Sequence, residues 1–160
     1  MSGLAMSGLA TVRQRGFTYL GLLFAIAFLG LLLASVGATW HTTLQREREA
    51  ELLFVGRQFA QAIAAYREAT PGDQKQWPQR FEDLLEDRRG LVLRRHLRRI
   101  YPDPFTGSAE WGLIKSGVFI VGVHSRGTGK PFKQAGFLPG EETFAGAASY
   151  RDWQFTGRAQ

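Results

Sequence analysis

The feature that most constrains the fold is a long apolar segment near the amino terminus. It begins directly after Gly16, and no Asp, Glu, Lys or Arg occurs between Phe17 and Gln45. As an α-helix, residues 17–40 measure about 36 Å at a rise of roughly 1.5 Å per residue, longer than a hydrocarbon core of about 30 Å. A backbone in lipid must satisfy its own hydrogen bonds, so we expect a transmembrane helix over residues 17–40.

The same helix is expected to continue as an amphipathic helix over residues 41–70. This stretch lacks Pro and is rich in Ala, Leu, Glu, Gln and Arg, which favour helix. Arg46 and Glu49 are spaced to pair on its surface, and Pro71 predicts that the helix ends near Thr70. Apolar residues recur at spacings of three and four, which predicts one buried stripe: Leu52, Val55, Phe59, Ile63 and Tyr66.

Residues 71–160 are expected to form a small globular region with helix and antiparallel strands. Pro78 predicts the first turn of a short helix, which Gly90 would end. Its apolar face would be Phe81, Leu84 and Leu85. The segments 110–114 and 118–124 predict a hairpin, with the second segment buried on both faces and central in the sheet.

A last strand is expected over residues 149–155, with Tyr150, Trp153 and Phe155 as aromatic contacts. The predicted fold class is therefore α+β: a long N-terminal transmembrane and amphipathic helix packed on a small C-terminal antiparallel sheet. The chain carries a net charge of +6 and contains no cysteine, so neither disulfides nor thiol ligands contribute.

The densest basic cluster follows the predicted short helix. If residues 91–100 were helical, four arginines would share one face opposite Leu93, Leu97 and Ile100; these arginines are Arg94, Arg95, Arg98 and Arg99. Such a face could contact DNA, an acidic protein or anionic lipid. We expect instead a solvated face whose charge is balanced by nearby acids, and contact with nucleic acid is the less favoured alternative. The acids are Glu82, Asp83, Glu86 and Asp87.

No catalytic constellation is expected. The three histidines, His41, His96 and His124, do not stand at metal-ligand spacing. Ser125 follows His124 directly, and neighbouring residues on a strand point to opposite faces. The paired acids Glu141 and Glu142 are expected on a solvated loop.

The segment RQRGFTYLGLLFAI, residues 13–26, resembles the prepilin-type leader and helix start of type IV pilins and of type II secretion pseudopilins. The motif consists of a basic leader, a terminal Gly, Phe at the next position and an immediate apolar helix. A second resemblance is the turn Asp103-Pro104-Phe105-Thr106-Gly107, which is similar to the Asp-Pro-Trp-Gly-like turn of pseudopilins. Prolines in this turn exclude helix, and its glycine tolerates positive φ.

This resemblance implies a leader at residues 1–16 with basic residues Arg13 and Arg15, cleavage between Gly16 and Phe17 by a prepilin peptidase, and N-methylation of Phe17. It implies assembly with other pseudopilins or pilins into a short periplasmic filament, driven by an inner-membrane platform and its ATPase, in aid of protein secretion. The positive-inside rule places the N-terminus in the cytoplasm, with a single pass through the bacterial inner membrane and a periplasmic domain, residues 71–160, at the far end of the helix.

One departure from the family pattern matters. The family usually has Glu at the fifth mature position, where this chain has Gly21, which favours a minor subunit near the filament tip. Some members bind calcium; no cofactor is expected here, although a calcium site remains an alternative. The carboxylates available for it have no recognisable ligand spacing: Asp103, Glu110, Glu141, Glu142 and Asp152.

Two other functions fit the same sequence. A signal-anchored periplasmic binding module would keep its N-terminus uncut and would not polymerise. A competence-type pseudopilin would bind DNA through the basic cluster, with steep salt dependence.

Overall fold

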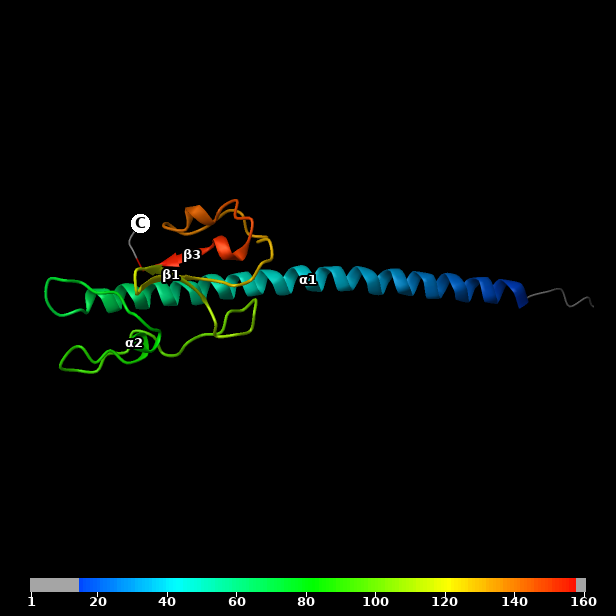
Figure 1. Ribbon diagram of the computed structural model, residues 1–160. Helices are drawn as coiled ribbons and strands as arrows, with labels where there is room; N and C mark the ends of the chain where they lie inside the picture. The colour runs from blue at the N-terminus through cyan, green and yellow to red at the C-terminus, as the bar shows by residue number, and fades with distance from the viewer. Residues whose placement is uncertain (1–14, 158–160) are drawn as a thin grey trace, which may run out of the picture. The chain divides into compact units, whose positions relative to one another are not determined.

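The computed structural model describes residues 15–157, and for residues 15–17 and 33–41 it describes the backbone alone. The described part is α+β, with helices and one three-stranded antiparallel sheet, as predicted. Figure 1 shows the elements in chain order. They are α1 (Arg15–Glu68), α2 (Glu82–Leu85), β1 (Gly112–Ser116), β2 (Phe119–His124), the 3₁₀ helices η1 (Glu142–Phe144) and η2 (Tyr150–Asp152), and β3 (Gln154–Thr156).

The chain divides into two units, residues 1–42 and residues 43–160. In the first unit, every side chain described from residue 18 to residue 32 is exposed, including the large apolar side chains Phe24, Phe28 and Leu31. The described residues include no helix with the length and apolarity that crossing a membrane requires. Of the predicted span 17–40, residue 17 and residues 33–40 lie outside the described side chains.

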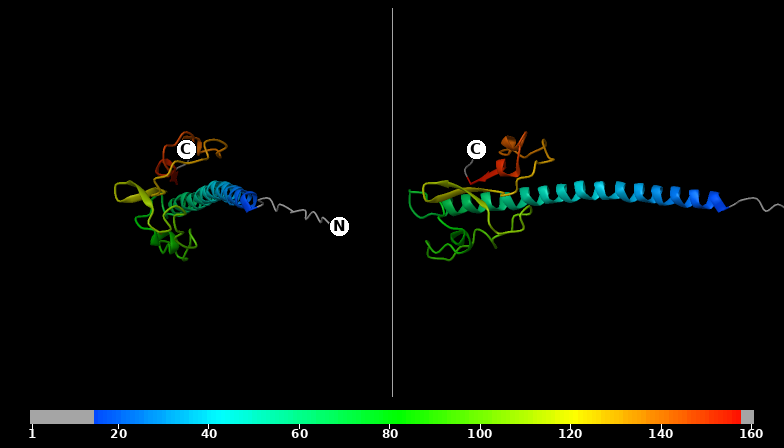
Figure 2. Two further views of the ribbon diagram at one scale, coloured as in Figure 1. Left: turned by 90° about the vertical axis from the view of Figure 1, so that its right-hand side faces the viewer. Right: turned by 45° about the vertical axis from the view of Figure 1, so that its right-hand side comes forward.

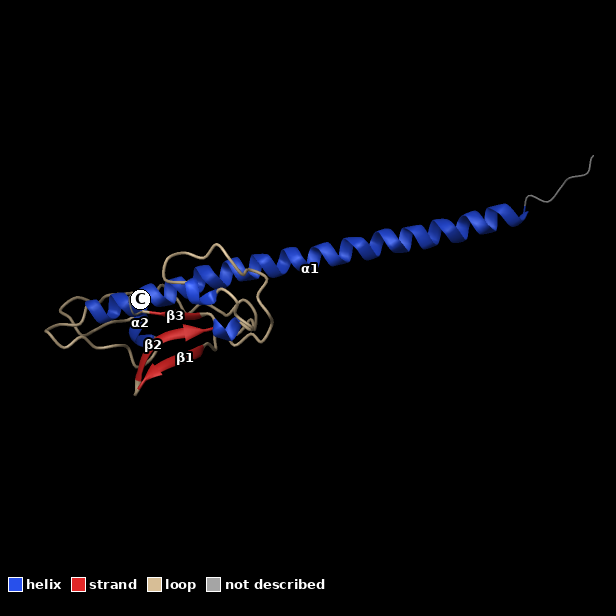
Figure 3. Ribbon diagram, turned by 90° about the horizontal axis from the view of Figure 1, so that it is seen from above, coloured by secondary structure: helices blue, strands red, loops and turns tan. Residues whose placement is uncertain are grey.

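The second unit is built on the buried stripe of α1. Each of the five predicted stripe residues is at most 7% exposed, and α1 ends at Glu68, close to the predicted Thr70; the five are Leu52, Val55, Phe59, Ile63 and Tyr66. In Figures 1 and 2, the orange segment with the 3₁₀ helices lies above this half of α1 and the segment containing α2 lies below it, and Figure 3 shows the sheet alongside the helix. The stripe predicted from spacing is therefore confirmed as the centre of the core.

The predicted hairpin is also confirmed. β1 and β2 pair antiparallel, and the turn between Ser116 and Phe119 contains Gly117 at a φ of 63°, a backbone conformation that favours glycine. β2 lies between β1 and β3, and four of its six residues are buried. Figure 3 shows the three strands side by side, with β3 nearest α1.

Two local predictions were wrong. Pro78 does not begin a helix: it is buried, its carbonyl accepts a hydrogen bond from the Ile120 amide at 2.7 Å, and α2 begins only at Glu82. The last strand begins at Gln154 rather than Ser149, because the Ser149 and Asp152 side chains form a capping box that starts η2.

Residues 91–100, for which a helix was considered only as one alternative, are not helical. The amides of His96 and Leu97 both donate to the carbonyl of Leu84, and Asp87 pairs with Arg94 in an antiparallel bridge. These non-local hydrogen bonds replace the local ones that a helix would need. Arg94, Arg95, Arg98 and Arg99 therefore lie on an irregular loop and do not share a helical face.

β3 approaches α1 closely because Gly56 has no side chain. A β-carbon added at Gly56 would lie 2.5 Å from the ring of Phe155, a residue only 3% exposed. A contact this short requires the ring to move within a packed core. The glycine thus sets how closely the helix and the sheet can pack.

We predict that Gly56→Ala lowers the free energy of unfolding by roughly 1–3 kcal/mol, because overpacking outweighs the gain in helix propensity of about 1 kcal/mol. Thermal unfolding followed by circular dichroism measures the change. In a Phe155→Leu background, the smaller side chain should remove most of the penalty for Gly56→Ala. An equal penalty in both backgrounds would contradict the proposed contact.

Candidate functional site

The predicted processing site lies at the N-terminal end of the described residues. Residues 1–14, including Arg13, lie outside the described residues, and so does most of the predicted leader. Arg15, Gly16 and Phe17 have helical backbone at the start of α1, and nothing is described of their side chains. Cleavage after Gly16 and methylation of Phe17 remain predictions.

The predicted charge balance of the basic cluster is only partly confirmed. Arg88 pairs with Glu86 at 2.6 Å, and Arg89 pairs with Asp87 at 2.8 Å. The other four arginines are exposed and have no ion pair among the described residues, although the guanidinium of Arg99 stacks over the Tyr101 ring; the four are Arg94, Arg95, Arg98 and Arg99. Three of the acids that were expected to neutralise them have other partners: Asp83 pairs with Arg80, Glu86 with Arg88, and Asp87 with Arg89.

Asp87 organises the base of this cluster. Its carboxylate, 4% exposed, accepts two side-chain hydrogen bonds from Arg89 and contacts the His96 ring at 3.0 Å. The Arg89 guanidinium also donates to the Tyr66 carbonyl and to the Thr70 hydroxyl, so it caps the C-terminal end of α1. The hydrogen bonds from Arg89 hold the pKa of Asp87 well below its usual range.

The turn predicted at residues 103–107 is confirmed, and it is anchored to a distant loop. The Asp103 side chain is fully buried and accepts hydrogen bonds from the Phe105 amide, the Ser125 hydroxyl and the Arg126 amide. Gly107 has a φ of 70° and donates its amide to the Asp103 carbonyl. The contacts of Asp103 with residues some twenty positions away were not predictable from spacing.

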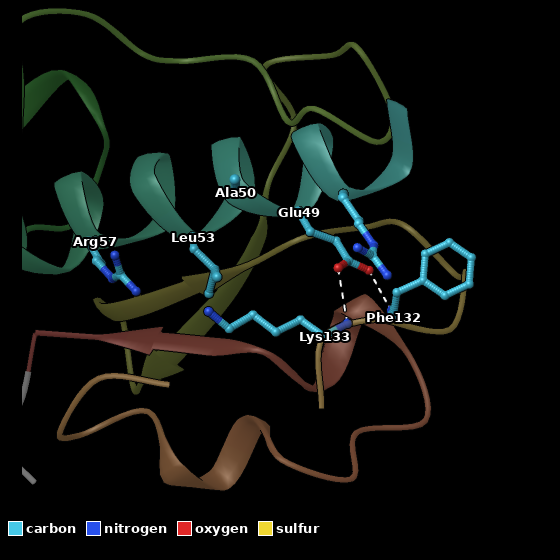
Figure 4. Close-up of a pocket in the computed structure, with 7 residues that line it drawn as sticks. Glu49, Ala50, Leu53, Arg57, Phe132 and Lys133 are labelled. Atoms are coloured by element: carbon cyan, nitrogen blue, oxygen red, sulfur yellow. Dashed lines mark hydrogen bonds between the residues drawn. The ribbon is translucent and has the colours of Figure 1, made fainter. Parts of the chain in front are cut away.

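Glu49 forms a second buried anchor, and sequence reasoning misassigned it. The predicted pair with Arg46 is absent from the described ion pairs, and Glu49 is only 2% exposed. Its carboxylate accepts hydrogen bonds from the amides of Phe132 and Lys133, at 2.6 and 3.1 Å, and from the Tyr150 hydroxyl at 2.7 Å. Figure 4 shows the two amide bonds. Burial, reinforced by the bond to the Glu49 carboxylate, raises the pKa of Tyr150.

A hollow of about 450 Å³ opens beside Glu49 and is lined by both charged and apolar side chains: Arg46, Glu49, Ala50, Leu53, Arg57, Phe132 and Lys133. Three of these residues are cationic, but Arg57 is already held by Glu141 in a two-point ion pair, with nitrogen–oxygen distances of 2.5 and 2.8 Å. Both carboxylate oxygens of Glu49 likewise accept hydrogen bonds from amides of the loop. These carboxylates therefore tie loops to α1 and are poorly suited to act as a general base.

Glu141 corrects another expectation, since it is 8% exposed rather than solvated. Its ion pair with Arg57 fastens the segment before η1 to α1. The carboxylates considered for calcium have separate partners: Asp103 binds loop amides, Glu110 pairs with Arg126, and Glu142 and Asp152 accept backbone amides beside their own helices. In residues 15–157, no group of three or more His, Asp or Glu side chains could hold a metal ion.

The histidines have separate surroundings. His96 contacts Asp87, His124 contacts the Ser125 carbonyl at 2.8 Å, and nothing is described of the His41 side chain. The Ser125 hydroxyl donates to Asp103 rather than to His124. Ser125 therefore stabilises the turn, and His124 does not act on it as a base in this arrangement.

No protein-family model matches this chain, and comparison with curated proteins and with solved structures finds no significant match.

We predict that Asp87→Asn lowers stability by about 2 kcal/mol at neutral pH, because it removes the charge that holds Arg89 over the end of α1. A carboxylate with a lowered folded pKa stabilises fully above its unfolded pKa, about 4, and this contribution is lost as the pH falls through the folded value. The difference in melting temperature between wild type and variant should therefore shrink below about pH 4. Asp73→Asn, at an exposed aspartate, is the control; a difference independent of pH would contradict the account.

We predict that Glu49→Ala frees the loop around Phe132 and lowers stability by about 1–3 kcal/mol, since it leaves buried donors without an acceptor. Trypsin should then cut after Lys133 faster than in the wild type. Glu51→Ala, at an exposed position on the same helix, is the matched control. Equal cleavage rates in the two variants would show that Glu49 does not hold the loop.

Proposed function

We propose that this chain is a pseudopilin-like subunit of a type II secretion or type IV pilus system, acting through assembly and without catalysis. The observation that carries the proposal is that the chain buries one face of the second half of α1 and leaves the first half exposed. From Leu52 to Tyr66 one face of the helix is buried by the chain's own sheet and loops. From residue 18 to residue 32 every side chain is exposed, although most of them are apolar.

An exposed apolar surface of this kind is costly in water. Tyr19, Phe24, Phe28 and Leu31 are each between 63% and 73% exposed. Contiguous apolar patches mark sites that a membrane or another protein covers. In the proposal, the inner-membrane lipid covers residues 17–40 first, and the helices of neighbouring subunits cover them after assembly.

The leader motif supplies the processing step. A prepilin peptidase would cleave after Gly16 and methylate the new terminus at Phe17. The ATPase and platform of the assembly system would then move the subunit from the inner membrane into a periplasmic filament, with the region beyond residue 70 outside the cytoplasm. Gly21, in place of the family's usual Glu, supports a place at the filament tip.

The second unit supports the assembly role through its rigidity. Loops around residues 132 and 141 are tied to α1 by Glu49 and Arg57, both on the helix itself. A subunit held in this way presents a constant surface to neighbours and to secreted cargo. The carboxylates of Glu49 and Glu141 are engaged in these contacts and are therefore poorly placed to act in catalysis.

We predict that co-expression with a prepilin peptidase yields a protein that starts at N-methyl-Phe17, as measured by intact mass and N-terminal sequencing of the membrane fraction. Gly16→Ala should block this processing, and the leader should remain when no peptidase is supplied. A leader that stays attached with every peptidase supplied would sink the proposal in favour of an anchored periplasmic module.

A further inference from the structure

The basic–apolar loop, residues 88–99, contains an unusual concentration of exposed aliphatic side chains. Leu91, Val92 and Leu93 are 107%, 70% and 49% exposed, and they are consecutive in the sequence. The tip is therefore a projecting aliphatic surface rather than part of the core. The core cluster includes only one aliphatic residue of this loop as buried, Leu97 at 4%.

The base of the loop is held firmly. Asp87 and Arg94 exchange two backbone hydrogen bonds, at 2.8 and 3.1 Å, which close the loop below its tip. Leu97 is buried, and its amide donates to the Leu84 carbonyl. The Asp87–Arg89 ion pair braces the same base. The exposed tip of the loop is therefore carried on a base that is fixed to the rest of the fold.

Basic side chains flank the tip, and most of them have no acidic partner. Arg88 and Arg89 are paired with Glu86 and Asp87. The remaining four guanidiniums are exposed and have no ion pair among the described residues: Arg94, Arg95, Arg98 and Arg99. Exposed aliphatic side chains beside guanidiniums without an ion pair match a partner whose outer surface is negatively charged and whose interior is apolar.

We propose that the basic–apolar loop docks on an anionic lipid surface, with Leu91, Val92 and Leu93 entering the acyl boundary and the four arginines that have no ion pair among the described residues binding lipid phosphates. Burying aliphatic side chains in lipid is favourable, and each basic residue near an anionic surface adds to the attraction. A bilayer accepts a projecting tip without a preformed pocket, whereas a protein partner would need a matching groove. Duplex DNA would use the arginines and leave the aliphatic tip in water.

This inference is independent of the proposed function, since it concerns the second unit alone. The test uses the full chain held in phosphatidylcholine nanodiscs, so that any membrane anchor is already occupied. The chain contains no native cysteine, so Val92→Cys provides a unique site for an environment-sensitive dye. Val118→Cys is the matched control, because Val118 is 66% exposed at a turn and the sequence contains no arginine from residue 100 to residue 125.

Vesicles of phosphatidylcholine with phosphatidylglycerol, carrying nitroxide on their acyl chains, should shift the dye at residue 92 to the blue and quench it, and should leave the dye at residue 118 unchanged. Vesicles of phosphatidylcholine alone should do neither. Replacing Arg94, Arg95, Arg98 and Arg99 by Gln should weaken vesicle binding by at least roughly tenfold, and added salt should weaken it as well.

A second variant separates the aliphatic contribution from the charge. Val92→Asp should weaken vesicle binding, and Val118→Asp should leave it unchanged. The proposal is overturned if neither vesicle affects the dye at residue 92, if neutral and anionic vesicles act equally, or if duplex DNA or polyglutamate binds the loop while anionic vesicles do not.

Discussion

The second half of α1 is the surface on which the rest of residues 43–157 depends. Its stripe from Leu52 to Tyr66 supplies the apolar area that a three-stranded sheet of short strands cannot supply for itself. β3 reaches this stripe because Gly56 leaves room for the Phe155 ring. The sheet therefore takes its position from the helix, and β2 becomes central because β3 is fixed beside α1.

Buried carboxylates provide the second level of organisation. Glu49, Asp87 and Asp103 are each less than 5% exposed, and each accepts hydrogen bonds from a segment that has little regular structure. Hydrogen bonds of this kind satisfy loop amides that a larger sheet or longer helices would otherwise pair. In a chain without disulfides, Glu49 links a loop to α1, and Asp87 and Asp103 link loop segments to one another.

The sequence was most informative where periodicity decides the structure. The α1 stripe, the end of the helix near Thr70 and the β1–β2 hairpin follow from spacing and turn residues alone, so all three were predicted. The hydrogen-bond partners of residues 91–100 were not predicted, because they are Leu84 and Asp87, and no local pattern encodes such partners. The burial of Glu49 was not predicted for the same reason, because its spacing from Arg46 equally fits an exposed ion pair.

Two candidate surfaces were predicted to different extents. The residues of the leader motif could be named from the sequence, and their role remains a prediction. The arginines of the basic–apolar loop were recognised, but their lack of acidic partners and the exposure of the Leu91 tip required the tertiary structure. Neighbouring acids in the sequence suggested neutralisation, whereas in the folded chain three of them, Asp83, Glu86 and Asp87, pair with Arg80, Arg88 and Arg89.

The account's central claim is that the chain itself covers one half of α1 and that something outside the chain covers the other. Phe24 and Phe54 allow a matched comparison, because both are exposed on α1, at 70% and 56%, one in each unit. The measurement is the rate at which an impermeant maleimide labels Phe24→Cys and Phe54→Cys in membranes from cells that express only this chain. We predict rapid labelling at residue 54 and protection at residue 24 until detergent is added. Equal rates at the two positions before detergent would contradict the claim.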